Sequence, residues 1–212
     1  MKTFLVWIPA IVCYALLLGW YINWQGPLKP AEVERLMQRL QSSGAGDNDR
    51  NDLAIMRRFL SEDDGREFFM LNLVRIAPGE VEGPDGVTAP ARKVVEGYTK
   101  VFMPALFARG GHPAIVGRKV GGYFDAWGVE PDPGWTIIGY MRYRSRRDLA
   151  MLASDPRFAG AHDFKFAAMP NTYSFPTRPQ MMALASPVVW VGLLLALAAA
   201  VAQITWLLRL KG

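Results

Sequence analysis

The 212-residue chain has a single cysteine, Cys13, and only two histidines, His112 and His162. One cysteine cannot form an internal disulfide, and Cys13 lies in an apolar stretch, which excludes a cysteine nucleophile from the polar part of the chain. The histidines could be a pair of haem or metal ligands, or one could be a general base. Only Asp163, directly beside His162, stands near them, which is a poor arrangement for chelation. The sequence therefore favours structural histidines and predicts no metal and no cofactor.

Charged residues are absent from both ends of the chain. None occurs from Thr3 to Leu28 or from Pro179 to Leu208, whereas all 19 acidic residues and all but three of the 24 basic ones lie between. A hydrophobic fraction of 51% and an aromatic fraction of 12% exclude a disordered chain. A charged fraction of 20% excludes a polytopic membrane protein. The chain therefore has two apolar ends and a polar middle.

The first apolar run extends from Phe4 to Trp24, and a bilayer core of about 30 Å needs about 20 such residues in a helix. Trp7 near one end, and Trp20 and Tyr21 near the other, suit the two membrane interfaces. A cleaved signal peptide is the alternative, but bulky aromatic side chains occupy the place where small residues should precede a cleavage site. We therefore predict an uncleaved transmembrane helix over residues 4–24.

The second apolar run predicts a transmembrane helix over residues 185–208. Pro187 suits the first turn of this helix, and Trp206 and Arg209 mark its far interface. A buried core helix is the alternative, but a charge-free core helix of this length would be unusual. Small residues such as Gly192 and Ala196 would let another helix approach closely.

The distribution of basic residues gives opposing indications of membrane orientation. Three cations at the extreme ends favour cytoplasmic termini, whereas Lys29, Arg35 and Arg39 follow the first helix and argue the other way. The polar middle has about 150 residues, and a segment of that length crosses a membrane largely regardless of its charge. We expect a two-pass protein of the cell membrane, which would be a bacterial inner membrane. We expect both termini in the cytoplasm and the polar middle domain outside it.

The polar middle begins with a predicted helical adaptor over residues 29–65. A helix over Pro30–Gln41 would place four apolar residues on one face: Val33, Leu36, Met37 and Leu40. A loop by composition and a helix over about Leu53–Ser61 follow.

Residues 66–177 predict an α+β domain with the ferredoxin-like order β-α-β-β-α-β. The predicted elements are a strand over Glu67–Ile76, a loop over Ala77–Pro90, a helix over Arg92–Ala108, strands over about Ala114–Ala126 and Thr136–Arg144, a helix to Ala153 and a strand over about Phe164–Ser174. Ser145 and Asp148 form a capping signature at the start of the second helix. The first strand is apolar on both faces, so a partner, most simply a second copy, should cover the sheet face without helices.

Several of these segments resemble a known family. The chain is similar to the domain of unknown function 1330 family in four segments. These are MLNLVRI, a helix that contains Tyr98 and ends at Gly110-Gly111, GWTIIGYMRYRSRRDLAML, and SDPRF. The resemblance covers about Glu67 to Thr177, and it implies the dimeric α/β-barrel arrangement of the ferredoxin-like superfamily. The flanking apolar helices are additions to the short soluble chains usual in that family.

The candidate ligand-binding residues are Asn72, Tyr98, His112 and Tyr123. Asn72 interrupts an apolar strand face, and an inward polar group must find a hydrogen-bond partner. It could orient a ligand between sheet and helices, with Tyr98 and Tyr123 as neighbours, although satisfaction by the backbone is the simpler explanation.

The candidate interaction patch is the basic set Arg142, Arg144, Arg146 and Arg147. Two of these arginines fall in the first turn of a predicted helix, where the helix dipole disfavours cations. A lipid headgroup, a partner protein, or nearby Asp148 and Asp155 could compensate. Nucleic acid is not an expected partner, because the middle segment is nearly neutral.

Two functions follow from these observations. The first is a membrane-anchored non-catalytic module, an accessory or structural subunit of a larger membrane complex or a homodimer, with membrane lipid and other subunits or a second copy as partners. The alternative is a small-molecule-binding protein or a cofactor-independent oxygenase-like enzyme that uses a pocket in the α/β barrel. The shortage of catalytic groups favours a protein that is not an enzyme.

Overall fold

A computed structural model describes residues 5–44, 52–130, 132–158, 160–180 and 186–209. The chain divides into two compact units. One unit combines both ends, Met1–Trp24 and Pro179–Gly212, and the other is the segment Gln25–Arg178 between them. Lys2, Lys211 and the predicted helix starts at residues 4 and 185 lie outside the described residues.

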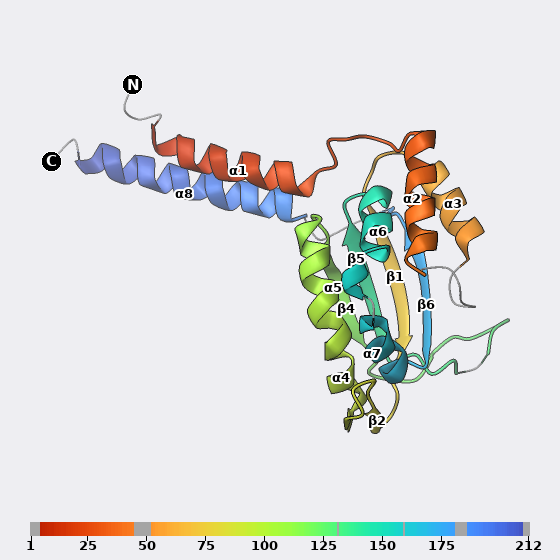
Figure 1. Cartoon of the computed structure of the whole chain (residues 1–212). Helices are drawn as coiled ribbons and strands as arrows, with labels where there is room; N and C mark the ends of the chain where they lie inside the picture. The colour runs from red at the N-terminus through yellow and green to blue at the C-terminus, as the bar shows by residue number, and fades with distance from the viewer. Residues whose placement is uncertain (1–4, 45–51, 131, 159, 181–185, 210–212) are drawn as a thin grey trace. The chain divides into compact units, whose positions relative to one another are not determined.

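A four-stranded antiparallel sheet forms the centre of Gln25–Arg178 (Figure 1). Its strands are β1 (Phe68–Arg75), β4 (His112–Arg118), β5 (Ile137–Tyr143) and β6 (Asn171–Thr177), in the order β4-β5-β1-β6. In β1, Asn72 pairs with Gly139 of β5 and with Ser174 of β6. A strand with apolar side chains on both faces suits this central position, where it has a neighbour on each side.

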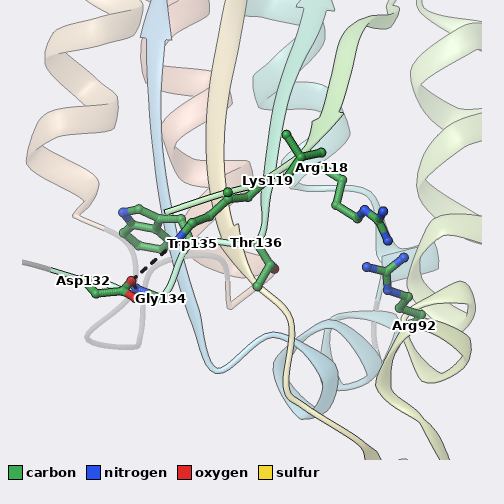
Figure 2. A pocket seen from close by; sticks show the side chains of 9 residues that line it. Arg92, Arg118, Lys119, Asp132, Gly134, Trp135 and Thr136 are labelled. Atoms are coloured by element: carbon green, nitrogen blue, oxygen red, sulfur yellow. Dashed lines mark hydrogen bonds and ion pairs between the residues drawn. The ribbon is translucent and has the colours of Figure 1, made fainter. Parts of the chain in front are cut away.

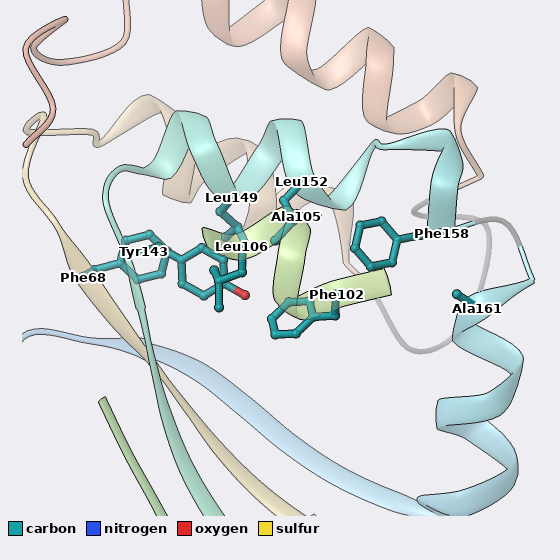
Figure 3. Packing of buried hydrophobic residues seen from close by; sticks show 9 residues of the cluster. All are labelled: Phe68, Phe102, Ala105, Leu106, Tyr143, Leu149, Leu152, Phe158 and Ala161. Carbon is teal, nitrogen blue, oxygen red and sulfur yellow. The ribbon is translucent and has the colours of Figure 1, made fainter. Parts of the chain in front are cut away.

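One face of the sheet is covered by helices. These are α4 (Ala91–Val94), α5 (Glu96–Ala108), α6 (Arg146–Ala153) and α7 (Ala161–Ala168). Figure 3 shows the main core, in which Phe68 of β1 stacks on Tyr143 of β5 with ring centroids 5.2 Å apart. Phe102 and Leu106 of α5 pack into the same cluster. Apolar burial of this kind stabilises a fold by about 25 cal/mol per Å² of surface removed from water.

The helices α2 (Pro30–Ser42) and α3 (Leu53–Ser61) pack beside α6. The predicted apolar face of the first of these helices is confirmed, because all four of its residues are buried. They form one cluster with Leu60 of α3 and Ala150 of α6. Asp52 caps α3, and its carboxylate accepts hydrogen bonds from Ala54 N and Ile55 N.

The local signals at two helix ends are also confirmed. Ser145 precedes α6, and its Oγ accepts a hydrogen bond from Asp148 N at 3.1 Å. After α5, Gly110 has a φ of +70°. A Cβ on the next residue, Gly111, would lie 2.8 Å from the carbonyl oxygen of Arg142, so this close approach of two backbones requires glycine.

The predicted last strand over Phe164–Ser174 is present, but its first part is wrong. Residues Ala161–Ala168 form helix α7, and β6 begins only at Asn171. The alternation of Phe164 and Phe166 imitates a strand, but the helical spacing of Ala161 and Ala168 decides the structure because both are buried there.

Other boundaries differ from prediction as well. The strand expected over Ala114–Ala126 is β4, which begins at His112 and ends at Arg118. The helix expected over Arg92–Ala108 is divided at Val95 into α4 and α5. The loop over Ala77–Pro90 contains a small hairpin of β2 (Glu80–Glu82) and β3 (Thr88–Pro90).

The unit made by the chain ends contains α1 (Trp7–Tyr21) and α8 (Pro187–Arg209). Among the described residues, α8 alone is long and apolar enough to cross a membrane, with 23 residues and a mean hydropathy of 2.2. Helix α1 has 15 residues, which span about 22 Å, and is thus shorter than the predicted 4–24. The two helices pack closely at Gly192, where a Cβ would lie 2.9 Å from the ring of Tyr14.

Candidate functional site

The face of the sheet opposite the helices is apolar and exposed. On this face, Leu71 of β1 lies between Tyr140 of β5 and Phe175 of β6, and the next row has Leu73 between Ile138 and Tyr173. The side chains that remain most exposed are Tyr173 at 63%, Ile115 at 50%, and Ile138 and Phe175 at 39% each. An apolar surface that extends over four strands is typical of a surface that another molecule covers.

An ion pair between a buried arginine and a partly exposed glutamate lies at one end of this face. Arg142 of β5 aligns with Phe69 of β1 and with His112 of β4, and only 2% of its side chain is exposed. Its guanidinium donates to Glu67 Oε2 at 2.6 Å through Nε and contacts the carbonyl oxygen of Gly110. Because the charge is neutralised inside the chain, this end of the face presents no free cation.

Asn72 lies on the helix side of the sheet and is hydrogen-bonded within it. Its Nδ2 donates to the carbonyl oxygens of Met70 at 3.0 Å and Gly139 at 3.4 Å. Its Oδ1 accepts a hydrogen bond from Ser174 Oγ at 2.8 Å. Strand β1 itself and its two neighbours thus provide partners for the amide, as the simpler of the two explanations expects.

Tyr98 belongs to an aromatic cluster between α5 and α7. Its ring centroid lies 5.3 Å from that of Phe102, 5.5 Å from that of His162 and 6.1 Å from that of Phe158. Burial raises the pKa of the Tyr98 hydroxyl well above its usual value. Lys165 of α7 has its Nζ 5.5 Å from the Tyr98 ring centroid, and burial lowers the pKa of this amine.

Sequence reasoning missed Lys165. The alternation of apolar residues in this segment predicts a strand, and only the helical spacing of Ala161, Lys165 and Ala168 places this lysine on a buried face. The helical period of 3.6 residues, as well as the strand period of two, must be tested on this segment to place Lys165 on a buried face.

The other two candidate ligand residues lie elsewhere. His112 is the first residue of β4, and its Nδ1 is 2.8 Å from the carbonyl oxygen of Pro113. The Tyr123 hydroxyl accepts a hydrogen bond from Trp135 N at 3.1 Å, and Lys119 Nζ lies 3.7 Å from the centre of its ring. The four candidates thus occupy a strand interior, a helix, a strand end and a loop, and a shared ligand site for them stays a prediction.

The arginines of the candidate interaction patch have acidic partners within the chain. Arg144 binds both carboxylate oxygens of Asp148, at 2.8 and 2.7 Å, which raises the pKa of the guanidinium. Arg147 binds Glu32 of α2 at 2.5 and 3.1 Å, and this hydrogen bonding lowers the pKa of the glutamate.

Arg146 completes this network. It lies 3.6 Å from Asp63, with its guanidinium 4.4 Å from the ring centroid of Phe59. Together with Arg142, these residues tie α2, α3 and the start of α6 to the sheet, and their binding of lipid stays a prediction.

A cleft of about 520 Å³ lies beside the end of β4 (Figure 2). Its lining residues are Arg92, Arg118, Lys119, Val120, Gly121, Asp132, Gly134, Trp135 and Thr136. They come from α4, from β4 and from the loop between β4 and β5. Sequence reasoning missed this cleft, because no motif links the lone Arg92 to residues of that loop.

The described part of the chain contains no group of three or more His, Cys, Asp or Glu residues that could hold a metal ion. No protein-family model and no curated protein matches the chain. The resemblance to the domain of unknown function 1330 family therefore stays a prediction.

Two solved structures are similar in fold. The crystal structure of methylated RPA0582 protein is 21% identical over 65% of this chain and 98% of that chain, with a TM-score of 0.52. A crystal structure of RPA0582 from Rhodopseudomonas palustris, described as a protein of unknown function, is 20% identical over 62% and 96%, with a TM-score of 0.51. At these identities the likeness shows only that the folds are similar. RPA0582 is itself described as a protein of unknown function, so the likeness indicates no activity.

Proposed function

We propose that this chain is a membrane-anchored, non-catalytic module whose sheet pairs with a second copy of itself. The exposed apolar face of the four strands carries the proposal. Tyr173, Phe175, Ile138 and Ile115 are exposed together on that face, and the two rows that contain them have no charged side chain. At the ends of the face, Arg142 is paired with Glu67, and Arg75 aligns with Asn171. A second copy would present the same apolar rows, so face-to-face packing would bury apolar surface while the charged side chains stay at the ends of the face.

The strand order supports a ferredoxin-like fold for the module. The first and third strands of the sheet along the chain, β1 and β5, are central, and the second and fourth, β4 and β6, are at the edges. With helices on one face, this is the order expected of a split βαβ unit. Pairing of two such sheets through their open faces would give a dimeric α/β barrel.

For the anchor we propose a two-pass arrangement with cytoplasmic termini and an extracytoplasmic sheet domain. The length and hydropathy of α8 support one crossing, and the packing of α1 against it supports the second. Protease added to intact spheroplasts should cut the exposed 77–90 segment. Cleavage only after the membrane is broken would place the domain in the cytoplasm instead.

The dimer is tested with the full chain in mild detergent, by native mass spectrometry. The wild type should be a dimer, and Phe175→Glu should weaken dimerisation at least about tenfold, because burial of an unpaired carboxylate costs several kcal/mol. Phe124→Glu is the matched control, because Phe124 is fully exposed in the loop after β4. A wild type that is monomeric overturns the homodimer, and stoichiometric capture of other membrane subunits would favour an accessory subunit.

A further inference from the structure

Two arginines face each other across the cleft beside β4. Figure 2 shows the guanidinium groups of Arg92, from α4, and Arg118, from the end of β4, pointing toward one another. Neither has a carboxylate or hydrogen-bond partner among the residues that the structure describes, whereas Arg57, Arg144 and Arg147 are each bound to one. Two adjacent cations repel each other, and an anion between them would remove that repulsion.

The surroundings of the two arginines strengthen the positive character of the cleft. Asp132 is the acidic residue of the lining, and Lys119 lies 3.7 Å from its Oδ1. Arg75, at the end of β1, adds a further cation, since its side chain would lie 3.0 Å from a Cβ on Gly134 of the lining. The loop that carries Trp135 and Thr136 completes the wall. The cleft thus has more cations than its single carboxylate can balance.

We propose that this cleft binds a phosphate-class oxyanion between Arg92 and Arg118. A guanidinium binds two oxygens of one anion through parallel N–H groups. A carboxylate has one such two-oxygen edge and can bind only one arginine in this bidentate way, whereas a tetrahedral phosphate presents a different edge to each of two arginines on opposite walls. The geometry therefore favours phosphate over carboxylate.

The same chemistry is offered by a small phosphorylated molecule and by the headgroup of an anionic phospholipid. The first is free in solution, and the second belongs to a bilayer. Binding of inorganic phosphate tests whether the cleft recognises the phosphate group that both sources share. A change in the lipid composition around the protein then distinguishes the phospholipid headgroup from the soluble molecule.

The test uses the full chain in nanodiscs of phosphatidylcholine at constant ionic strength, titrated with inorganic phosphate in a calorimeter. Saturable binding of one phosphate per chain is expected. Arg92→Gln and Arg118→Gln should each weaken binding about tenfold or more, because each removes charge-assisted hydrogen bonds to the anion. Lys93→Gln is the matched control: it removes one charge from the same short helix outside the lining, and should change affinity less than about twofold.

Two results would overturn the site. One is the absence of saturable binding to the wild type, and the other is an equal loss of affinity in the Lys93→Gln control. Because both arginines are exposed, their variants should keep the wild-type circular dichroism spectrum. In nanodiscs with phosphatidylglycerol, loss of phosphate binding through competition identifies the lipid headgroup as the ligand, and unchanged binding identifies a soluble phosphate compound.

Discussion

His162 lies in an environment that disfavours its charged form. Its ring centroid is 5.4 Å from that of Phe158, 5.5 Å from that of Tyr98 and 6.0 Å from that of Phe166. Burial, and then repulsion from Lys165, lowers the pKa of this histidine below its ordinary value of 6.5. The folded chain therefore binds a proton at His162 less readily than the unfolded chain.

This difference predicts an acid-sensitive stability. Between the folded pKa and 6.5 the unfolded state binds more protons, so the free energy of unfolding should fall as the pH decreases below about 6.5. His162→Phe should remove this part of the slope while keeping a ring in the cluster. Urea unfolding at a series of pH values from 7.5 downward measures it.

His162→Gln separates titration from packing. Glutamine does not titrate, so this variant should also lose the slope, but without a ring it should be less stable than the wild type even at pH 7.5. A slope below pH 6.5 that is equal in all three proteins would contradict the assignment to His162.

At the scale of elements, a polar contact joins the two apolar helices. Trp7 Nε1 of α1 donates a hydrogen bond to Gln203 Oε1 of α8 at 2.6 Å. Gln203→Leu should weaken the association of these helices by about 1 kcal/mol, because hydrogen bonds between membrane helices contribute about 0.6–2 kcal/mol. A lower thermal midpoint of the full chain in detergent would show this.

Thr205→Val is the control for that experiment. Its hydroxyl bonds the carbonyl oxygen of Val201 within α8, so the variant removes a polar group from the same helix without loss of a bond to α1. Equal thermal midpoints for Gln203→Leu and wild type would show that the hydrogen bond between Trp7 and Gln203 does not stabilise the helix pair.

Elements with strong local signals could be predicted from the sequence. The first strand, the apolar face of α2 and the Ser145 cap depend on residues within a few positions of each other, and all three are present. Helix α7 could not be predicted in this way, because Phe164 and Phe166 alternate as in a strand. Its burial depends on Val74 of β1 and on Ile76 just after that strand, which lie about 90 residues earlier.

At the scale of the whole molecule, an ion pair of an arginine could be predicted only where its acidic partner lies nearby in the sequence. Arg144 binds Asp148 four residues away, and the sequence offered that partner. Arg142 and Arg147 bind Glu67 and Glu32, which are 75 and 115 residues away, and only the fold brings those charges together. The cleft likewise joins α4 to a loop far along the chain, so its two facing arginines could not be found from spacing.

The pairing of α1 with α8 joins the two ends of the chain, and this has a consequence for folding. Trp7 and Gln203, which a hydrogen bond joins, are 196 positions apart in the sequence. At ribosomal rates of about 5–20 residues per second, α8 is made roughly ten seconds or more after α1. The segment between them therefore has time to fold before its ends are joined. Once joined, the helices act as a non-covalent cross-link that reduces the conformational entropy of that segment when it unfolds. Loss of the helix pair should thus also lower the melting temperature of a sheet that neither helix belongs to.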